Sequence, residues 1–238
     1  MLRRIGELYG YRLGASDGDI GHVKDFYFDD RNWAIRYVVA DTGSWLPSRQ
    51  VLISPHPLGR VLHAEKVLRV NLTRKQIEQS PSIDSHKPVS RQYEEEYYRY
   101  YGWPYYWRGD ALWGMSGFPI LELPPQPLSI GSTDAISPCQ QPAADLHLRS
   151  TQAIHDYDVR AGRDKSIGHV CDFIMDSQRW WIRQLVVKTH RLSGKDVLIE
   201  TKNVERISYD QSTVFVNLSR ESVEQSSEHN LAPVAAGH

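Results

Sequence analysis

Residues 20–42 read IGHVKDFYFDDRNWAIRYVVADT, and residues 167–189 read IGHVCDFIMDSQRWWIRQLVVKT. Twelve of these 23 positions are identical without a gap. Residues 67–80 (VLRVNLTRKQIEQS) and 213–226 (TVFVNLSRESVEQS) match at seven of 14 positions, in the same order. A recurring block at fixed spacing indicates an internal repeat. The sequence therefore predicts two related units of similar length.

Each repeat has the pattern of short strands. Runs rich in β-branched and aromatic residues alternate with polar or glycine-containing turns, such as residues 16–19 (SDGD) and 29–32 (DDRN). The expected strands are residues 9–15, 20–29, 33–41, 51–54 and 67–72 in the first repeat, and 157–161, 167–176, 180–189, 197–201 and 213–218 in the second. We therefore expect a mainly β protein with two small antiparallel barrels.

A short helix is expected to close each barrel. Thr73 and Gln76 have the spacing of a capping box, in which each side chain satisfies a backbone N–H at the start of a helix. The predicted organisation is a first domain at 1–80, a connector at 81–150, a second domain at 151–227 and a flexible tail at 228–238.

The connector differs in composition from both repeats. It holds nine of the 13 prolines, and residues 118–145 are expected to be an extended linker. Residues 90–107 (SRQYEEEYYRYYGWPYYW) instead carry seven tyrosines and two tryptophans. Their spacing predicts an amphipathic helix at about 90–101, which Gly102 and Pro104 end.

The aromatic helix has two interpretations. Tyr93, Tyr97, Tyr100 and Tyr101 would share one face, with Glu94–Glu96 and Arg99 on the other. In the first interpretation the helix packs on the first domain and covers a sheet. In the second it is a contact surface, because tyrosine and tryptophan combine an apolar body with a polar group. The candidate binding residues are Tyr97, Tyr100, Tyr101, Trp103, Trp107 and, in a separate loop, Trp45.

Histidines His22 and His169 occupy equivalent positions in an I-G-H-V-x-D-F sequence. A His-x-x-Asp pair could bind a metal or carry a proton. Residues three apart on a regular strand point to opposite faces, so the pair cannot converge unless the strand is bulged. We therefore expect His22 and His169 to be structural or rim histidines, with a pH-sensitive contact as the alternative.

Two equivalent carboxylates, Asp25 and Asp172, lie among apolar neighbours and need partners if they are buried. Arg36 and Arg183 on the following strands are the expected partners. Whether Arg36 shares a face with Asp25 depends on the hairpin register, which the sequence leaves open.

Catalytic and cofactor motifs are missing from the sequence. It contains no G-x-S-x-G, no P-loop, no H-E-x-x-H and no C-x-x-C. The two cysteines, Cys139 and Cys171, are not equivalent positions of the repeat. A repeat of this size also leaves little room inside for a pocket. We expect no enzymatic activity, no cofactor and no bound metal.

Charge and hydropathy limit the partners. The formal net charge of −1 argues against nucleic acid. There is no apolar run like that of a signal peptide, and none near the roughly 18 residues of a membrane span. A cytoplasmic protein without membrane insertion is expected.

The segment IGHVKDFYFDD, followed by WAIRYVVADTGSWLP and RQVLISP, resembles the signature of PRC-barrel domains. The YEEEYYRYYGWPYYW segment also resembles a connector of tandem members. The resemblance implies a small β-barrel. The family includes the soluble domain of the photosynthetic reaction-centre H subunit and a domain of a ribosome-maturation factor, which both act by docking or positioning proteins. This chain is more similar to stand-alone bacterial members.

The function expected from these observations is a non-enzymatic protein-binding or scaffold module. One alternative is a peripheral partner of a membrane electron-transfer or photosynthetic complex, by analogy with the H subunit. Another is binding of a small ligand or glycan through the aromatic connector. The duplication is compatible with a pseudo-dimer inside one chain or with a homodimer, which we favour.

Overall fold

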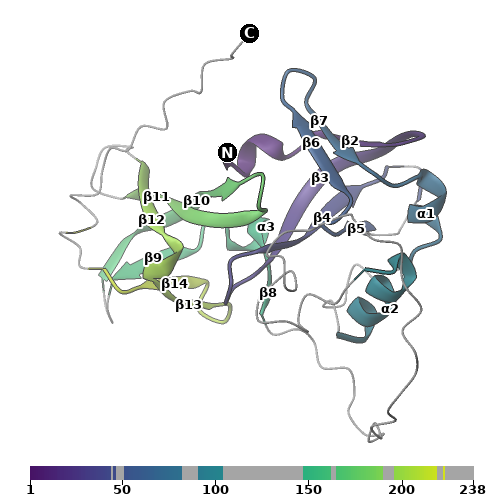
Figure 1. Cartoon of the computed structure of the whole chain (residues 1–238). Coiled ribbons are helices and arrows are strands. Elements are labelled where there is room, and N and C mark those ends of the chain that lie inside the picture. Colours follow the sequence, from purple (N-terminus) through teal and green to yellow (C-terminus); the bar gives the residue numbers. More distant parts are fainter. Residues whose placement is uncertain are drawn as a thin grey trace, which may run out of the picture. The chain divides into compact units, whose positions relative to one another are not determined.

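The structure is a computed structural model, which describes residues 1–43, 45–46, 51–81, 91–103, 147–161, 165–189, 196–218 and 222. The chain forms two compact units (Figure 1). The first-repeat unit is Tyr9–Leu148, and the second-repeat unit is Met1–Leu8 with Arg149–His238. The N-terminal eight residues therefore belong to the unit of the other repeat, which differs from the division predicted from the sequence.

The first-repeat unit is built on one mixed sheet, with strand order β5-β4-β3-β2-β7-β6 and β8 paired to β3. The strands of this sheet are β2 (Arg12–Ala15), β3 (Gly18–Asp29), β4 (Ile35–Asp41), β5 (Val51–Ile53), β6 (Leu58–Leu62), β7 (Val67–Val70) and β8 (Leu148–Ser150), of which β8 begins at the last residue of the unit. Along the path from β5 to β6, neighbouring strands run antiparallel except β2 and β7, which are parallel.

The second-repeat unit has the same strand order, β12-β11-β10-β9-β14-β13, with β1 paired to β10. Its strands are β1 (Leu2–Arg4), β9 (Asp158–Ala161), β10 (Lys165–Asp176), β11 (Trp181–Thr189), β12 (Asp196–Glu200), β13 (Val204–Ser208) and β14 (Thr213–Val216). Short helices are η1 (Gly6–Leu8), α3 (Thr151–Ile154) and η3 (Thr201–Asn203). The parallel pair is β9 with β14.

The mainly β prediction is confirmed, with two differences in detail. Each sheet is mixed rather than antiparallel. Among the described residues, the pairing also ends at β5 and β6 in one sheet and at β12 and β13 in the other, so the described strands do not close into barrels. The sequence pattern could not reveal the parallel pair, because strand direction depends on how the chain returns to the sheet.

The two long strands carry the same irregularities. A bulge lies between Val23 and Asp25 in β3, and another lies between Val170 and Asp172 in β10. Just before each bulge stands a glycine, Gly21 or Gly168. A Cβ on Gly21 would lie 2.0 Å from the carbonyl oxygen of Asp41, and one on Gly168 would lie 2.2 Å from that of Lys188. Only glycine allows the two strands to approach this closely, which explains the repeated I-G-H.

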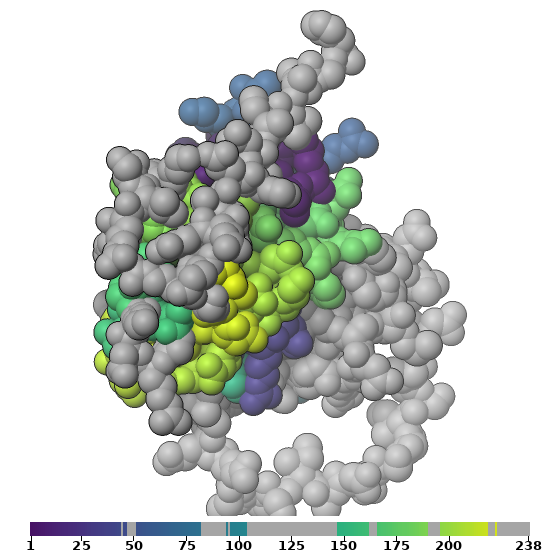
Figure 2. Space-filling model, turned by 90° about the vertical axis from the view of Figure 1, so that its left-hand side faces the viewer, coloured from purple at the N-terminus to yellow at the C-terminus, as the bar shows by residue number. Residues whose placement is uncertain are grey.

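The strands β1 and β8 are exchanged between the repeats. In the sequence they occupy equivalent places, ahead of β2 and β9, yet β1 pairs with β10 and β8 with β3. Figure 2 shows the purple N-terminal atoms beside green atoms of the second-repeat unit. Each repeat therefore supplies one strand to the sheet of the other.

The short helix of the first repeat and the aromatic helix agree with the sequence-based expectation, whereas the helix expected to close the second repeat falls almost entirely outside the described residues. Helix α1 (Arg74–Glu78) begins at Thr73 with the complete capping box, and α2 (Arg91–Tyr101) covers the aromatic segment. The expected linker at 118–145 and the tail at 228–238 lie outside the described residues.

Candidate binding surface on the aromatic helix

Helix α2 packs on one face of the first-repeat sheet. The register places Tyr27 opposite Tyr37 and Asp25 opposite Val39. Side chains directly opposite one another share a face. A buried cluster forms on this face from Tyr37, Val39, Leu52, Tyr97 and Tyr98. The helix therefore covers the sheet, as the packing interpretation expects.

An ion pair without exposed atoms fixes the helix to the sheet. Arg36 of β4 donates to the Oε1 atom of Glu94 in α2, and its guanidinium lies 3.5 Å from Asp29. The hydroxyl of Tyr37 donates to the same Glu94 oxygen at 3.0 Å. A buried carboxylate needs such donors to offset its lost hydration. The position of α2 along the sheet is therefore set by polar contacts as well as apolar ones.

Tyr97 adds a second polar anchor. Its hydroxyl accepts a hydrogen bond from the backbone N–H of Ser54 at 3.0 Å and donates one to the carbonyl oxygen of Leu52 at 3.0 Å. Both backbone groups belong to the end of β5, where the sheet path stops. The tyrosine thus satisfies edge groups that would otherwise need water.

The C-terminal end of α2 carries an aromatic group, which we call the aromatic end: Tyr100, Tyr101 and Trp103. Tyr101 and Trp103 stack with ring centroids 4.3 Å apart and planes 10° apart. Tyr100 meets Tyr101 edge to face at 4.8 Å and is 40% exposed. Tyr101 and Trp103 are half-buried. The aromatic end thus packs against the buried Tyr97 and Tyr98 through Trp103, while Tyr100 is exposed.

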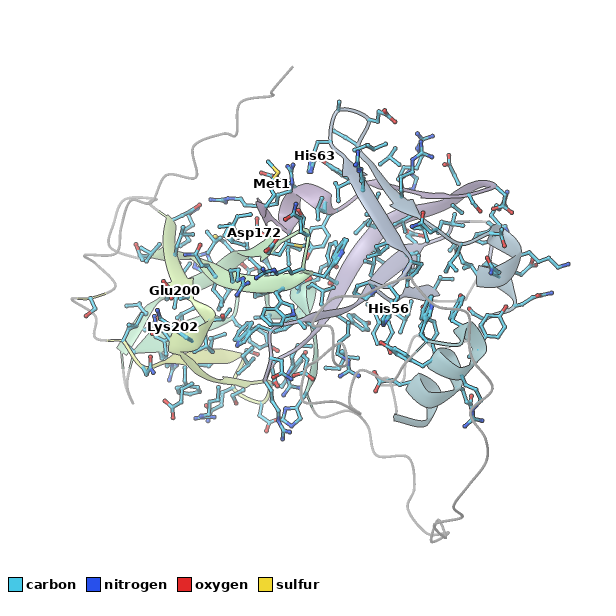
Figure 3. All side chains as sticks on the ribbon, in the orientation of Figure 1. Met1, His56, His63, Asp172, Glu200 and Lys202 are labelled. Carbon is cyan, nitrogen blue, oxygen red and sulfur yellow. The ribbon has the colours of Figure 1, made fainter. Side chains whose placement is uncertain are left out.

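His56 lies under the aromatic end, between the strands and α2 (Figure 3). Its ring stacks on Trp103 with centroids 5.3 Å apart and meets Tyr98 edge to face at 6.0 Å. Burial lowers the pKa of His56 to about 4. The ring is therefore neutral near pH 7 and packs as an aromatic residue.

The face of α2 that packs is rotated from the one predicted. Glu94, expected on the solvent side, is buried, and Tyr98 is buried while Tyr100 is exposed. The reason is the Arg36 side chain, whose buried charge requires Glu94 on the inner side. Glu94 and Tyr98 are four residues apart and so share a helix face.

The candidate binding residues divide between core and surface. Tyr97 is 1% exposed and belongs to the core, so it offers no contact surface in this structure. Trp45 is half-buried, with the guanidinium of Arg74 4.6 Å from its ring centroid. Trp107 lies outside the described residues. Tyr100 and Tyr101 in α2, and Trp103 just after it, remain as the described candidates.

A regular strand would place His22 and Asp25 on opposite faces, but β3 is bulged between Val23 and Asp25 and the two residues share a face. His22 pairs with Asp41, and Asp25 pairs with Val39. Asp41 and Val39 are two apart on β4 and share a face, so His22 and Asp25 share it as well. The bulge after Val23 adds one residue and reverses the alternation. His22 is exposed whereas Asp25 is buried.

The carboxylates of Asp25 and Asp172 have a backbone role. Asp25 accepts from the N–H of Phe26 at 2.7 Å, and Asp172 accepts from that of Phe173 at 2.7 Å. Asp172 also accepts from the N–H of Gly6 at 2.9 Å. Burial raises the pKa of Asp172, and these hydrogen bonds oppose the shift. Both carboxylates thus stabilise bulged backbone.

The expected arginine partners take other positions. Arg36 pairs with Glu94 and Asp29. Arg183 stacks over Trp181 at 5.1 Å from the ring centroid. His169 is half-buried and is paired in register with Lys188 and Asp158. The hairpin register explains why Arg36 does not lie opposite a residue of β3. The register shifts between Tyr27 and Phe28, and this shift skips Arg36.

The sequence reasoning missed His56 and misplaced Glu94. His56 has no equivalent signal in the second repeat, and a single histidine between prolines gives no pattern. Glu94 could have been found, since it precedes Tyr97 and Tyr98 by three and four residues.

Three observations concern the remaining titratable groups and the helices of the described residues. No group of three or more His, Cys, Asp or Glu side chains is placed there to hold a metal ion. Burial raises the pKa of the Cys171 thiol to about 11, so it stays protonated. No described helix is long and apolar enough to cross a membrane.

No model of a protein family matches the chain, and no curated protein matches its sequence.

Proposed function

We propose that the chain is a non-enzymatic protein-binding module and that the aromatic end of α2 is its contact surface. The observation that carries this proposal is the stacked pair of Tyr101 and Trp103 beside the exposed Tyr100. Large aromatic side chains that are rigid before binding lose little conformational entropy when a partner covers them. Such residues commonly contribute most of the binding energy at protein interfaces.

The support under the aromatic end favours this use. Tyr97 and Tyr98 are buried, and the Arg36–Glu94 pair and the two Tyr97 hydrogen bonds hold the helix in register. The hydroxyl of Tyr100 donates to the carbonyl oxygen of Gln76 in α1. The surface is therefore formed by ordered elements of one unit, and a partner can bind it without rearranging it.

Protein is favoured over a glycan by the stacking of Trp103. Two rings, Tyr101 and His56, already lie nearly parallel to it. A sugar or a nucleobase needs a free ring face on which to stack. A protein can instead use the exposed Tyr100 and the edges of the other two rings.

The barrel fold is part of the same proposal. We infer that each unit is a PRC-barrel-type domain, in which the open sheet curves around its core. The identical strand order of the two units and their paired bulges support this, because bulges are what bend long strands. The protein-docking role of PRC-barrel proteins agrees with a binding module.

The test compares matched tyrosines. Tyr100 and Tyr209 are each 40% exposed, but they belong to different units. Wild type, Tyr100→Arg and Tyr209→Arg are used to capture proteins from the native host, and each captured protein is then purified and titrated calorimetrically. We expect at least one partner whose Kd rises about tenfold or more with Tyr100→Arg and stays unchanged with Tyr209→Arg.

Two results would contradict the proposal. One is a partner that binds Tyr100→Arg as tightly as wild type and loses affinity only with Tyr209→Arg. The other is the absence of any partner that binds purified wild type. Circular dichroism melting of the three proteins checks that Tyr100→Arg keeps its fold.

A further inference from the structure

The exchange of β1 and β8 is reciprocal at the level of single hydrogen bonds. The N–H of Ser177 donates to the carbonyl oxygen of Met1 at 3.0 Å, and the N–H of Asp30 donates to that of His147 at 2.9 Å. Ser177 and Asp30 are equivalent positions in the two hairpin turns. Each acceptor site is thus built to take the same kind of strand from a different part of the chain.

The donated segment Met1–Leu8 is an integral part of its acceptor unit. Ile5 and Leu8 are fully buried, and the N–H of Ile5 donates to the carbonyl oxygen of Phe173 at 2.9 Å. Arg4 forms an ion pair with Asp196 at 2.9 Å, with both side chains about one-third exposed. The second-repeat sheet therefore needs a strand at this place to bury its core.

Asp172 holds the end of the donated strand. Its carboxylate accepts a hydrogen bond from the N–H of Gly6. Met1 and Asp172 lie near one another in Figure 3. A Cβ on Gly6 would lie 2.8 Å from the Oδ2 atom of Asp172. This close fit selects the segment and its register.

The join between the donated strand and the rest of its repeat is short. The chain passes from one unit to the other between Leu8 and Tyr9. Gly10 follows with a φ of 74°, and a Cβ placed there would meet nothing within 4 Å. The backbone can therefore turn at this point without a side chain in the way.

We propose that Met1–Leu8 is a transferable strand and that its partner is a second copy of this chain. In the resulting dimer, β1 of each copy pairs with β10 of the other. Every contact of the segment is kept, because the second copy offers an identical acceptor. The monomer, in which the segment binds its own chain, and the dimer then differ only in the backbone at Leu8 and Tyr9 and in the entropy of association. This inference concerns assembly and is independent of the aromatic end.

A disulfide reports which chain supplies the strand. Leu2 pairs with Asp176 in the β1–β10 register, so a cysteine pair at these positions has the spacing of a disulfide. The full chain carries Cys139→Ser and Cys171→Ser to remove its own thiols, together with Leu2→Cys and Asp176→Cys. The protein is unfolded in urea under reducing conditions, refolded at low and at high concentration, and oxidised. Light scattering coupled to gel filtration and non-reducing gels then give the mass and the linkage.

The proposal predicts a dimer whose share rises with refolding concentration and whose two chains are linked on the non-reducing gel. Asp172→Ala, which removes the acceptor for Gly6 in the monomer and in the dimer alike, should reduce the intrachain and the interchain disulfide together. Single-cysteine variants serve as controls and should give no more linked dimer than background. A chain that stays monomeric at every concentration overturns the proposal. So does a dimer whose disulfides are all within one chain, since its strands have not been exchanged.

Discussion

Arg36 and Glu94 form an ion pair in which neither side chain is more than 1% exposed. Glu94 also accepts from Tyr37, and Arg36 lies near Asp29. The pair joins α2 to β4, so it connects the candidate binding surface to the sheet. Removing one member of such a pair leaves the other charge buried without its main partner.

Arg36→Met should therefore destabilise the first-repeat unit strongly, by roughly 3–5 kcal/mol. Glu94→Gln should cost less, because the amide still accepts from Tyr37. The double variant should be more stable than Arg36→Met alone, since no uncompensated carboxylate remains. Urea unfolding followed by circular dichroism measures the three free energies.

The matched control is the Arg4–Asp196 pair at the surface. Arg4→Met should lower the free energy of unfolding by no more than about 1 kcal/mol, as exposed pairs contribute little. Equal losses for Arg36→Met and Arg4→Met would show that the buried pair does not hold α2.

Tyr97→Phe tests the anchor at the edge of β5. The change leaves the buried N–H of Ser54 without its acceptor and should cost roughly 1–3 kcal/mol. Tyr100→Phe removes a hydroxyl that bonds Gln76 at the surface and should cost less than about 0.5 kcal/mol. Thermal melting of both variants measures the two losses of stability. A Tyr97→Phe protein as stable as wild type would contradict the role of the Tyr97 hydroxyl in fixing α2 to the end of β5.

The glycines before the bulges should not tolerate a methyl group. Gly21→Ala and Gly168→Ala place a Cβ against a backbone carbonyl on the adjacent strand, which the side chains cannot relieve. Each should lose roughly 3 kcal/mol or fail to fold its own unit. Gly14→Ala is the control, because its nearest neighbour would be a Val67 methyl at 3.4 Å. A small loss at Gly21 would show that the strands can separate there.

The pKa of His56 makes stability depend on pH. The value is about 4 in the folded protein against 6.5 for an ordinary histidine. As the pH falls, the unfolded chain therefore takes up a proton at this histidine before the folded protein does. The contribution of neutral His56 to the free energy of unfolding is complete above pH 6.5 and is lost as the pH falls towards 4. A shift of this size corresponds to about 3 kcal/mol.

His56→Phe keeps a ring on Trp103 and should flatten this part of the stability–pH curve. Urea midpoints at pH 7, 6, 5 and 4 for wild type and variant give the difference. Parallel curves would mean that His56 is already charged in the folded state or does not contribute.

Much of the fold followed from the repeat. Because two copies of a pattern support each other, the β3–β4 hairpin and its equivalent could be predicted. Helix α1 could be predicted from its capping box, and α2, which lies outside the repeat, from the spacing of its tyrosines. The strands β1 and β8 could not. Three residues give no periodicity, and their partners are chosen by the tertiary structure rather than by the local sequence. Strand β6 was missed because Gly59 interrupts its pattern.

The site was predicted only in outline. The aromatic content of the helix was evident, but which tyrosines face the sheet depends on one buried arginine on a different strand. The bulges at Lys24 and Cys171 were also hidden, since a bulge residue differs between the repeats and leaves no common signal. Only the structure therefore shows which of these side chains are buried and which face of the helix or strand each one occupies.

The exchanged strand also sets an order of events during synthesis. Met1 and its partner Asp176 are separated by 175 residues. At roughly 5–20 residues per second, β1 waits about 10–35 s on the ribosome before β10 exists. During that interval its edge is unpaired, and the neighbouring nascent chains of a polysome offer the same acceptor.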